Sequence, residues 1–445
     1  MQDRVPVNPG RVKITPEGGS AYYATMVRAD NPTQEGTPLS KDTLFSAAAE
    51  GKYPDGVDTP SKAFEEISNR LPKVGDIKTT VRADLGDKWL LCNGDTISDS
   101  EYPELVQVLP ASDGLTKTLP KTNVSSTHKV YCHNGVWVIT GTDSGGYLYI
   151  FTATDPNGVW VERKICDTSG FSAGATYNNI VCCNGVWVIT ANLKTSGRIL
   201  SATDPTGTWT LINPNYGDYY LKDITYYNGK WVAILNYYSG STPYIATCST
   251  LDGTWTKTSL SSAGLSSSSL SLRNLYVYNG MLVMTSGEDN SVYTATNPTG
   301  TWARHQVASS ATVYDVRYQD GHWVASGRNS SSYPSVWIAT NIDGTWIEKV
   351  VATQPNVSLD AITYTNGKWI AAGNYSTEGY AYVTTGPTGE WTQVFSGSTN
   401  YAIDVYGEDG VWVGATTNYN IFYGGIPLLP TLEADKSYVY IKAKE

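Results

Sequence analysis

Residues 360–394 hold the pattern that decides the fold. They read DAITYTNGKWIAA from Asp360 to Ala372 and, after a loop, AYVTTGPTGEWTQV from Ala381 to Val394. An Asn-Gly pair between two runs of alternating character is a strong signal of a tight β-hairpin, because both turn residues need a positive φ. Pro-Thr-Gly marks a second turn between runs that are rich in β-branched and aromatic residues. The stretch predicts four antiparallel strands, a to d, at residues 360–365, 368–372, 381–385 and 390–394.

The same unit repeats along the middle of the chain. Asn/Asp-Gly-x-Trp begins at residues 134, 184, 228, 320, 366 and 409, and a degenerate copy, Asn279-Gly-Met-Leu282, fills the one long gap. A second motif, close to Asp/Asn-Pro-Thr-Gly-Thr-Trp, ends at Trp160, Trp209, Trp255, Trp302, Trp346 and Trp391. Four strands in each unit of about 40–50 residues are typical of a β-propeller blade. We predict a mainly β fold, a β-propeller at residues 128–425 in which both Trp series pack between blades.

The repeat has six complete units and a shorter seventh. Residues 401–423 supply three strands but no closing Gly-x-Trp strand. An open sheet edge leaves backbone hydrogen-bonding groups unpaired, so a ring needs that edge filled. Residues 113–119 read DGLTKTL and resemble DGTWTKTSL at residues 252–260, which include strand d of the third unit. We predict that residues 113–119 close a seven-bladed ring. The alternative is a short edge where the seventh blade meets a neighbouring domain.

The composition excludes several classes of partner. The chain has 31 Lys and Arg against 41 Asp and Glu, a formal net charge of −10. This charge disfavours nucleic acid, because phosphate binding needs a basic surface, and it disfavours strongly anionic polymers unless Lys and Arg gather locally. No apolar run reaches the ~18 residues of a membrane-spanning helix, and the first residues lack the apolar core of a signal peptide. We expect synthesis in the cytoplasm, no secretion by the usual route and no membrane insertion.

Patterns typical of metal and catalytic sites are missing from the sequence. The six cysteines show no Cys-x-x-Cys pair, which predicts reduced thiols that pack as small apolar side chains. The four histidines, His128, His133, His305 and His322, have no metal-ligand spacing, and neither a calcium loop nor a Gly-x-Ser-x-Gly elbow occurs. The Asp-x-x-Gly-x-Trp turns resemble the Asp-box hairpin of sialidases, but the Arg residues of the repeats do not cluster as sialidase chemistry requires. We predict no catalytic residues, no metal and no cofactor.

Residues 71–110 resemble the collar domain of phage tail fibres. In order, they contain Val74-Gly-Asp-Ile77, Lys88-Trp-Leu-Leu-Cys-Asn-Gly94 and Tyr102-Pro-Glu-Leu105. Residues 438–443 are similar to the last strand of the same fibres. Segments 11–16, 26–30 and 35–39 are similar to N-terminal segments of tail fibres from phages of Gram-positive hosts. Leu-Pro pairs precede and follow the propeller, at residues 119–120 and 429–430. Because a closed ring brings its ends together, we expect the propeller to be an insertion in a collar-like domain.

The resemblance implies four parts of the chain. They are an N-terminal virion-attachment segment at residues 1–70, the first part of the collar-like domain at 71–127, the propeller at 128–425, and the C-terminal collar strand at 426–445. Within residues 1–70 we expect a strand at 9–16 and two short helices, at 40–50 behind the candidate N-cap Ser40 and at 59–67. So few apolar residues make a poor core, which favours docking on baseplate or other tail proteins. The resemblance also implies a homotrimer.

The connections between strands fall into a uniform set and a variable set. In a four-stranded meander, the a–b and c–d turns share one face of the ring, and the b–c and d–a connections share the other. The variable b–c and d–a connections carry Tyr, including Tyr147, among Ser, Asn and Gly. Rigid aromatic rings among small polar residues give contact area at low entropic cost, as in binder paratopes. We predict that this face binds ligand through Tyr216, Tyr219, Tyr220, Tyr237, Tyr238, Tyr333, Tyr375 and Tyr380.

Together with the resemblance, these features favour a phage tail fibre or receptor-binding protein. We expect it to attach the virion to a host cell-surface ligand, a glycan or a surface protein, through the variable face. Several copies on one particle would multiply weak contacts, since later binding steps become intramolecular. Two alternatives stay open. One is a glycan-degrading tail enzyme that uses a pair of carboxylates, and the other is a purely structural baseplate or collar component.

Overall fold

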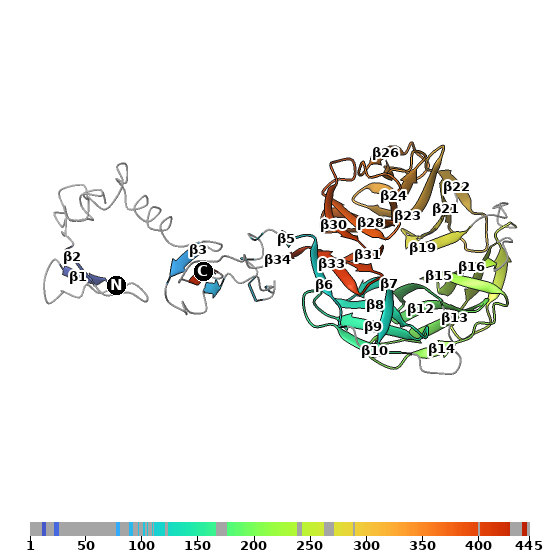
Figure 1. Cartoon of the computed structure of the whole chain (residues 1–445), viewed down its shortest axis with the longest axis horizontal. Helices are drawn as coiled ribbons and strands as arrows, with labels where there is room; N and C mark the ends of the chain where they lie inside the picture. The colour runs from blue at the N-terminus through green and yellow to red at the C-terminus, as the bar shows by residue number, and fades with distance from the viewer. Residues whose placement is uncertain are drawn as a thin grey trace, which may run out of the picture. The chain divides into compact units, whose positions relative to one another are not determined.

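The chain forms two compact units, one at residues 110–428 and a smaller one at residues 1–109 and 429–445. The computed structural model describes residues 11–14, 22–25, 77–80, 89–91, 97, 101–102, 105, 109, 111–120, 123–165, 176–237, 243–261, 271–287, 290–398, 401–427 and 438–442. The larger unit is a seven-bladed β-propeller (Figure 1). The predicted mainly β propeller fold is therefore confirmed.

Each blade is a four-stranded antiparallel sheet, and in six of the seven the strands follow the order of the chain. Blade one is β7 (Val124–His133), β8 (Val136–Asp143), β9 (Leu148–Ala153) and β10 (Val161–Lys164). Blade two is β11 (Thr176–Cys183), β12 (Val186–Leu193), β13 (Ser196–Ala202) and β14 (Thr210–Ile212). Blade three is β15 (Tyr219–Tyr227), β16 (Lys230–Tyr237), β17 (Tyr244–Cys248) and β18 (Thr256–Ser259). Blades four and five are β19 (Leu272–Tyr278), β20 (Met281–Ser286), β21 (Ser291–Ala295) and β22 (Ala303–Gln306); and β23 (Ala311–Gln319), β24 (His322–Asn329), β25 (Pro334–Ala339) and β26 (Ile347–Val350). Blade six is β27 (Ser358–Thr365), β28 (Lys368–Tyr375), β29 (Glu378–Thr384) and β30 (Thr392–Ser398), and blade seven contains β31 (Ala402–Glu408), β32 (Val411–Thr416) and β33 (Asn420–Gly424).

The repeated Asn/Asp-Gly pairs form the a–b turns of all seven blades. The Asn or Asp has φ between 42° and 52°, and the Gly that follows has φ between 71° and 87°. Two successive positive φ values are those of a type I′ turn, whose twist matches that of the paired strands. The degenerate fourth copy follows the rule, with φ 46° at Asn279 and 74° at Gly280. We call the end of the propeller that carries these turns and the c–d turns the turn face, and the opposite end the loop face.

The Trp series on strand b is buried between blades, as the repeat predicts. Its members are at most 5% exposed, and Leu282, which replaces Trp in blade four, is fully buried. The series on strand d is also buried, apart from the half-buried Trp346. In blade two the indole Nε1 of Trp209 donates to the carbonyl of Pro205 at 3.1 Å, while Asp204 Oδ1 accepts from the backbone N–H of Thr206 at 2.8 Å. The c–d turn thus satisfies its own polar groups, which is a structural role.

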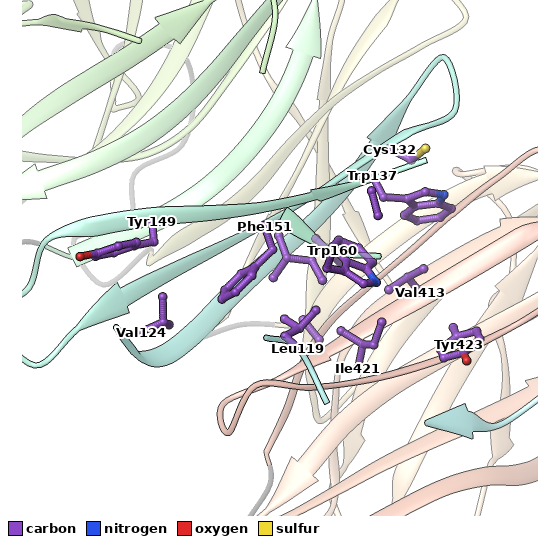
Figure 2. Packing of buried hydrophobic residues seen from close by; sticks show 14 residues of the cluster. Leu119, Val124, Cys132, Trp137, Tyr149, Phe151, Trp160, Val413, Ile421 and Tyr423 are labelled. Carbon is purple, nitrogen blue, oxygen red and sulfur yellow. The ribbon is translucent and has the colours of Figure 1, made fainter. Parts of the chain in front are cut away.

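The ring closes with a strand from the N-terminal side of the propeller. Strand β6 (Leu115–Thr118) pairs antiparallel with β33 and becomes the outermost strand of blade seven. This confirms the predicted closing strand at 113–119. Leu119 then lies with Ile421 of blade seven and with Phe151 and Trp160 of blade one in one apolar cluster (Figure 2). The first and last blades are therefore held by backbone pairing and by a shared core.

Asp113 fastens this closing strand to two blades. Its Oδ1 accepts from the indole Nε1 of Trp412 at 3.0 Å and from the backbone N–H of Gly425 at 3.1 Å, and its Oδ2 pairs with the ammonium of Lys368. A second short pairing, β5 (Ala111–Ser112) with β34 (Ile426–Pro427), lies just before it. One carboxylate thus binds donors from blades six and seven to the incoming chain.

In the smaller unit, strands from both sides of the propeller share one sheet. Strand β35 (Tyr438–Lys442) pairs with β3 (Ile77–Thr80) and with β4 (Trp89–Leu91), so the propeller is inserted between strands of this sheet. A separate pair joins β1 (Arg11–Ile14) to β2 (Tyr22–Thr25), which confirms a strand within the predicted range 9–16. The two helices expected at 40–50 and 59–67 lie outside the described residues.

Four of the six cysteines lie in the described part of the chain, and all four are free thiols. Cys132, Cys182 and Cys248 are buried and Cys183 is half-buried, as expected of small apolar side chains. Burial raises the pKa of the Cys182 thiol to about 11. Cys92 and Cys166 lie outside the described residues. No helix in the described part has the length and apolar character needed to span a membrane.

Candidate functional site

The innermost strand of every blade carries a β-bulge near the loop face. The register shifts lie between Thr127 and Val130, Tyr177 and Asn179, Leu221 and Asp223, Leu272 and Leu275, Val313 and Asp315, Leu359 and Ala361, and Ala402 and Asp404. A bulge adds one residue, bends the strand and frees backbone groups from the ladder. In each blade it falls five and six residues before the Asn/Asp of the a–b turn. The bulges therefore form a ring around the central channel.

The sequence also carries a signal for these bulges, apart from the repeat motifs. Strict alternation fails at each of them, because two residues lie between apolar neighbours, as in Leu221-Lys-Asp-Ile224 and Leu272-Arg-Asn-Leu275. An extra residue restores the apolar side chains to the same face of the strand. The residue types at the bulges differ from blade to blade, so the ring is chemically asymmetric.

At the loop face the bulge residues surround a polar hollow of about 340 Å³, which we call the channel mouth. Its lining includes Lys129, Asn178, Lys222, Arg273 and Asp360. The ammonium of Lys129 lies 3.5 Å from Asp404, and the guanidinium of Arg273 lies 3.6 Å from Asp360. Burial and the nearby Arg273 lower the pKa of Lys222. The mouth thus gathers three cationic side chains on an otherwise acidic protein.

Deeper in the channel, carboxylates form hydrogen bonds between neighbouring blades. Asp223 accepts from Asn179 Nδ2 at 2.6 Å, from the backbone N–H of Ile224 at 2.7 Å and from that of Leu275 in the next blade at 2.7 Å. Asp315 and Asp404 likewise accept from a backbone N–H of the following blade. These donors follow the bulges directly. These carboxylates therefore accept hydrogen bonds from backbone N–H groups that the bulges release from strand pairing. Their main role is structural.

Burial weakens the acidity of these channel carboxyls. It raises the pKa of Asp223 to about 6, although three hydrogen bonds to the carboxylate act in the opposite direction. It also raises the pKa of Asp360 and Asp404, against the favourable charges of Arg273 and Lys129. Such shifts often mark functional sites, but here the hydrogen-bonding pattern accounts for the positions.

A second hollow of the channel reaches toward the turn face. A cavity of about 410 Å³ extends from the carboxylates to the turn residue Asn184, and Tyr131, Tyr226, Tyr276 and Tyr406 are part of its lining. The rings of Tyr131 and Tyr406 lie 4.4 Å apart, and the guanidinium of Arg317 lies 3.6 Å from the centre of the Tyr276 ring. Tyrosines therefore gather at the turn end of the channel as well, although the uniform turn sequences gave no sign of them.

Two of the eight predicted ligand-binding tyrosines are core residues. Tyr216 is 1% exposed, and its ring meets the edge of Trp255 at 5.5 Å. Tyr380 is 7% exposed, because it lies on strand β29 rather than in a loop, and its hydroxyl donates to Glu378. Neither ring is open to a ligand, so both leave the candidate set. Tyr238 lies outside the described residues.

Tyr219 and Tyr237 come together on the loop face of blade three. Their ring centres are 5.0 Å apart, and Tyr244, which the sequence analysis did not select, meets Tyr219 edge-on at 5.1 Å. The ammonium of Lys257 lies 4.6 Å from the centre of the Tyr219 ring. Burial and the neighbouring Tyr244 and Tyr237 raise the pKa of Tyr219 to about 12, so this hydroxyl keeps its proton at neutral pH. We call Tyr219, Tyr237 and Tyr244 the tyrosine shelf.

The remaining predicted tyrosines are spread over the loop face. Tyr220 follows the shelf on β15, and the ammonium of Lys222 lies 5.8 Å from its ring centre, which places it toward the channel mouth. Tyr333 is half-buried in the b–c loop of blade five, and Tyr375, 39% exposed, ends strand b of blade six. These three therefore do not join the shelf in one patch. Strand β15 alone contributes to both the shelf and the mouth.

Comparison with solved structures shows the fold and nothing finer. A structure of YCF48 bound to D1 peptide is 14% identical, with a TM-score of 0.53, and the match covers 71% of this chain and 98% of that one. A catalytically inactive virginiamycin B lyase from Staphylococcus aureus with quinupristin is 13% identical, with a TM-score of 0.54 over 70% and 98%. The GH74 xyloglucanase from Xanthomonas campestris is 12% identical, with a TM-score of 0.51 over 75% of this chain and 56% of that one. No protein-family model and no curated protein matches the chain.

One arrangement away from the channel has the order of a catalytic triad. Thr294 Oγ1 lies 2.7 Å from His305 Nε2, and His305 Nδ1 lies 2.8 Å from Asp343 Oδ1. A nucleophile must be open to its substrate, whereas Thr294 is 5% exposed in the middle of a sheet. Asp343 belongs to the c–d turn of blade five, so the contact clamps this turn to blade four. Within the described residues no group of three His, Cys, Asp or Glu side chains could hold a metal ion.

Proposed function

We propose that this chain is a phage tail fibre or receptor-binding protein that attaches the virion to a glycan on the host cell surface through the loop face. The tyrosine shelf carries the proposal. Three half-buried rings with a lysine beside them form a rigid surface that matches the apolar face and hydroxyl edge of a sugar ring. The resemblance of residues 71–110 to a collar domain supports the tail assignment, the attachment role of residues 1–70 and a homotrimer.

The two ends of the propeller differ in a way that favours the loop face. On the turn face, backbone and side-chain groups of the turns bond to each other, as at Asp204 and Trp209. On the loop face, the connections differ between blades in length and sequence, and the rim carries Tyr375 and the cationic channel mouth. Variable loops on a rigid scaffold are where binding residues are typically found. The loop face therefore offers a specific surface that a repeated turn does not.

A glycan array probed with the full chain tests this proposal. We expect binding to a restricted set of glycans, and Tyr219→Ala with Tyr237→Ala should weaken that binding by at least about tenfold, because each ring provides a stacking surface worth roughly 1 kcal/mol or more. Tyr364→Ala is the matched control, since Tyr364 is also half-buried, packs on Trp369 and lines a hollow at the turn face. If the control variant loses binding, or if the shelf variant binds as tightly as the unaltered chain, the glycan does not bind at the shelf.

The same glycans distinguish the enzyme alternative. A depolymerase shortens the bound polymer, and product size measured over several hours detects this. Intact polymer supports adhesion alone. Shortening of the polymer that a single carboxylate substitution abolishes would support the glycan-degrading enzyme. A chain that binds no glycan and adsorbs to no cell would favour the purely structural alternative.

A further inference from the structure

The channel mouth holds a cation without a counter-ion. Of its three cationic side chains, Lys129 pairs with Asp404 and Arg273 with Asp360. Lys222 makes no ion pair within the described part of the chain, and it lines the same hollow as Arg273, a second cation whose charge acts on it. Two adjacent cations in a partly desolvated hollow repel each other, and that cost is relieved when an anion binds between them.

Arg273 is held in place from several sides. Its guanidinium lies 4.3 Å from the centre of the Tyr314 ring and faces Asp360 on one edge. Gly287 lies against the guanidinium, where any side chain would collide with it. Asp360 is itself satisfied, since it also accepts from Asn374 Nδ2 at 2.6 Å. The side chain of Arg273 is nevertheless 43% exposed, so its donors remain open toward the mouth.

The amides beside these cations do not supply the missing contacts. Asn178 Nδ2 donates to the carbonyl of Leu221 at 2.7 Å, and Asn274 Nδ2 donates to the carbonyl of Tyr314 at 3.1 Å. Both amides therefore brace the neighbouring strand. The binding capacity of the mouth lies with Lys222 and Arg273, which are charged donors, and charged donors select oxyanions.

We propose that the channel mouth is a binding site for an oxyanion carried by a saccharide, with Lys222 and Arg273 as its ligands. The group is a carboxylate, as in a uronic acid, or a phosphate, as in a phosphodiester-linked polymer. The hollow of about 340 Å³ accepts one sugar unit with its anionic group. The site goes beyond the adhesion proposal and does not depend on it, because it rests on the charges of the mouth and not on the shelf.

Calorimetric titration of the full chain with three probes tests the site. The probes are hexagalacturonate, an oligomer of glycerol phosphate, and neutral maltohexaose. We expect one of the two anionic probes to bind at least about tenfold more tightly than maltohexaose, with an affinity that falls as salt is raised. The anionic probe that binds identifies the oxyanion. Lys222→Gln and Arg273→Gln should each weaken that binding by about tenfold, as expected for the loss of one charged hydrogen bond.

Two controls make the result decisive. Lys230→Gln removes the same charge from an exposed position at the turn face and should leave the affinity unchanged, while Lys222→Arg should retain it. The inference is overturned if neither anionic probe binds, or if the Lys222→Gln, Arg273→Gln double variant binds as tightly as the unaltered chain. A chain that binds the anion here but no cell surface would uphold this site and refute the adhesion proposal, so the two can fail separately.

Discussion

At the scale of single residues, the bulge of blade one places a histidine where its protonated form is disfavoured. His128 is half-buried at the rim of the channel beside Lys129, and its Nε2 lies 2.9 Å from Thr142 Oγ1. Burial, followed by the positive charge of Lys129, lowers the pKa of His128 to about 4. The imidazole therefore stays neutral in the folded chain at pH values where an exposed histidine is half charged.

This setting predicts an acid-sensitive contribution to stability. The folded pKa lies below the unfolded value of about 6.5, so the unfolded state takes up the proton first and folding stability falls as the pH drops from about 6.5 to 4. Between pH 7.5 and pH 5 the loss is about 2 kcal/mol from this residue. His128→Gln keeps a hydrogen-bonding group but does not titrate, so its free energy of unfolding should fall by about 2 kcal/mol less over that range. Urea denaturation at the two pH values measures this difference.

The control for that prediction is Thr142→Val, which removes the partner of the imidazole and keeps the titrating group. It should lower stability at both pH values and retain the acid loss. Parallel pH curves for His128→Gln and the unaltered chain would show that this histidine is not held neutral by the fold.

At the scale of elements, blade seven is the one blade of the described propeller that takes a strand from a distant part of the sequence. Strand β6 adds backbone pairs to β33, and Asp113 binds Trp412, Gly425 and Lys368. The other six blades are complete within consecutive residues. Blade seven is therefore completed by a strand, and tied by a carboxylate, that precede the first blade.

Removing this carboxylate should loosen the closure. Asp113→Ala leaves the indole N–H of Trp412 without its acceptor and the ammonium of Lys368 without its carboxylate, and we expect a loss of about 2–4 kcal/mol in the free energy of unfolding. Asp204→Ala is the matched control, since it removes an exposed carboxylate from a c–d turn, and it should cost about 1 kcal/mol or less. Chemical denaturation of both variants measures the difference, and equal losses would show that Asp113 is an ordinary turn residue.

The strands and turns could be predicted because each repeat contains its own turn residues and alternating runs within a short stretch of sequence. In blade six, the expected strands at 360–365 and 368–372 lie within β27 and β28, and Asn366 adopts the positive φ that its turn requires. The tyrosines were harder to assign, because side-chain burial depends on neighbours from other strands. From the sequence, Tyr380 was assigned to a variable connection, but it lies on strand β29. Tyr244 lies beside the other two rings of the shelf because β17 pairs with β16. The cationic mouth combines residues from five blades, which no local pattern brings together.

At the scale of the whole propeller, the two ends of one channel have different chemistry. The loop end gathers cationic side chains, and strand β15 contributes both to it and to the tyrosine shelf. The turn end is lined by aromatic rings, with the guanidinium of Arg317 against the ring of Tyr276. Asp223, Asp315 and Asp404 separate the two ends and hold the blades together. A ring of this kind is a rigid frame that presents one variable surface.

Hydrogen–deuterium exchange of the full chain, with and without a glycan selected on the array, tests most directly that this surface is the ligand face. We predict slower exchange in the ligand complex at the start of β15 and in the b–c connections at residues 144–147, 330–333 and 376–377. The Asn-Gly turns at residues 134–135, 184–185 and 366–367 should exchange at unchanged rates. Protection of these turns, with the loop face unaffected, would contradict the account.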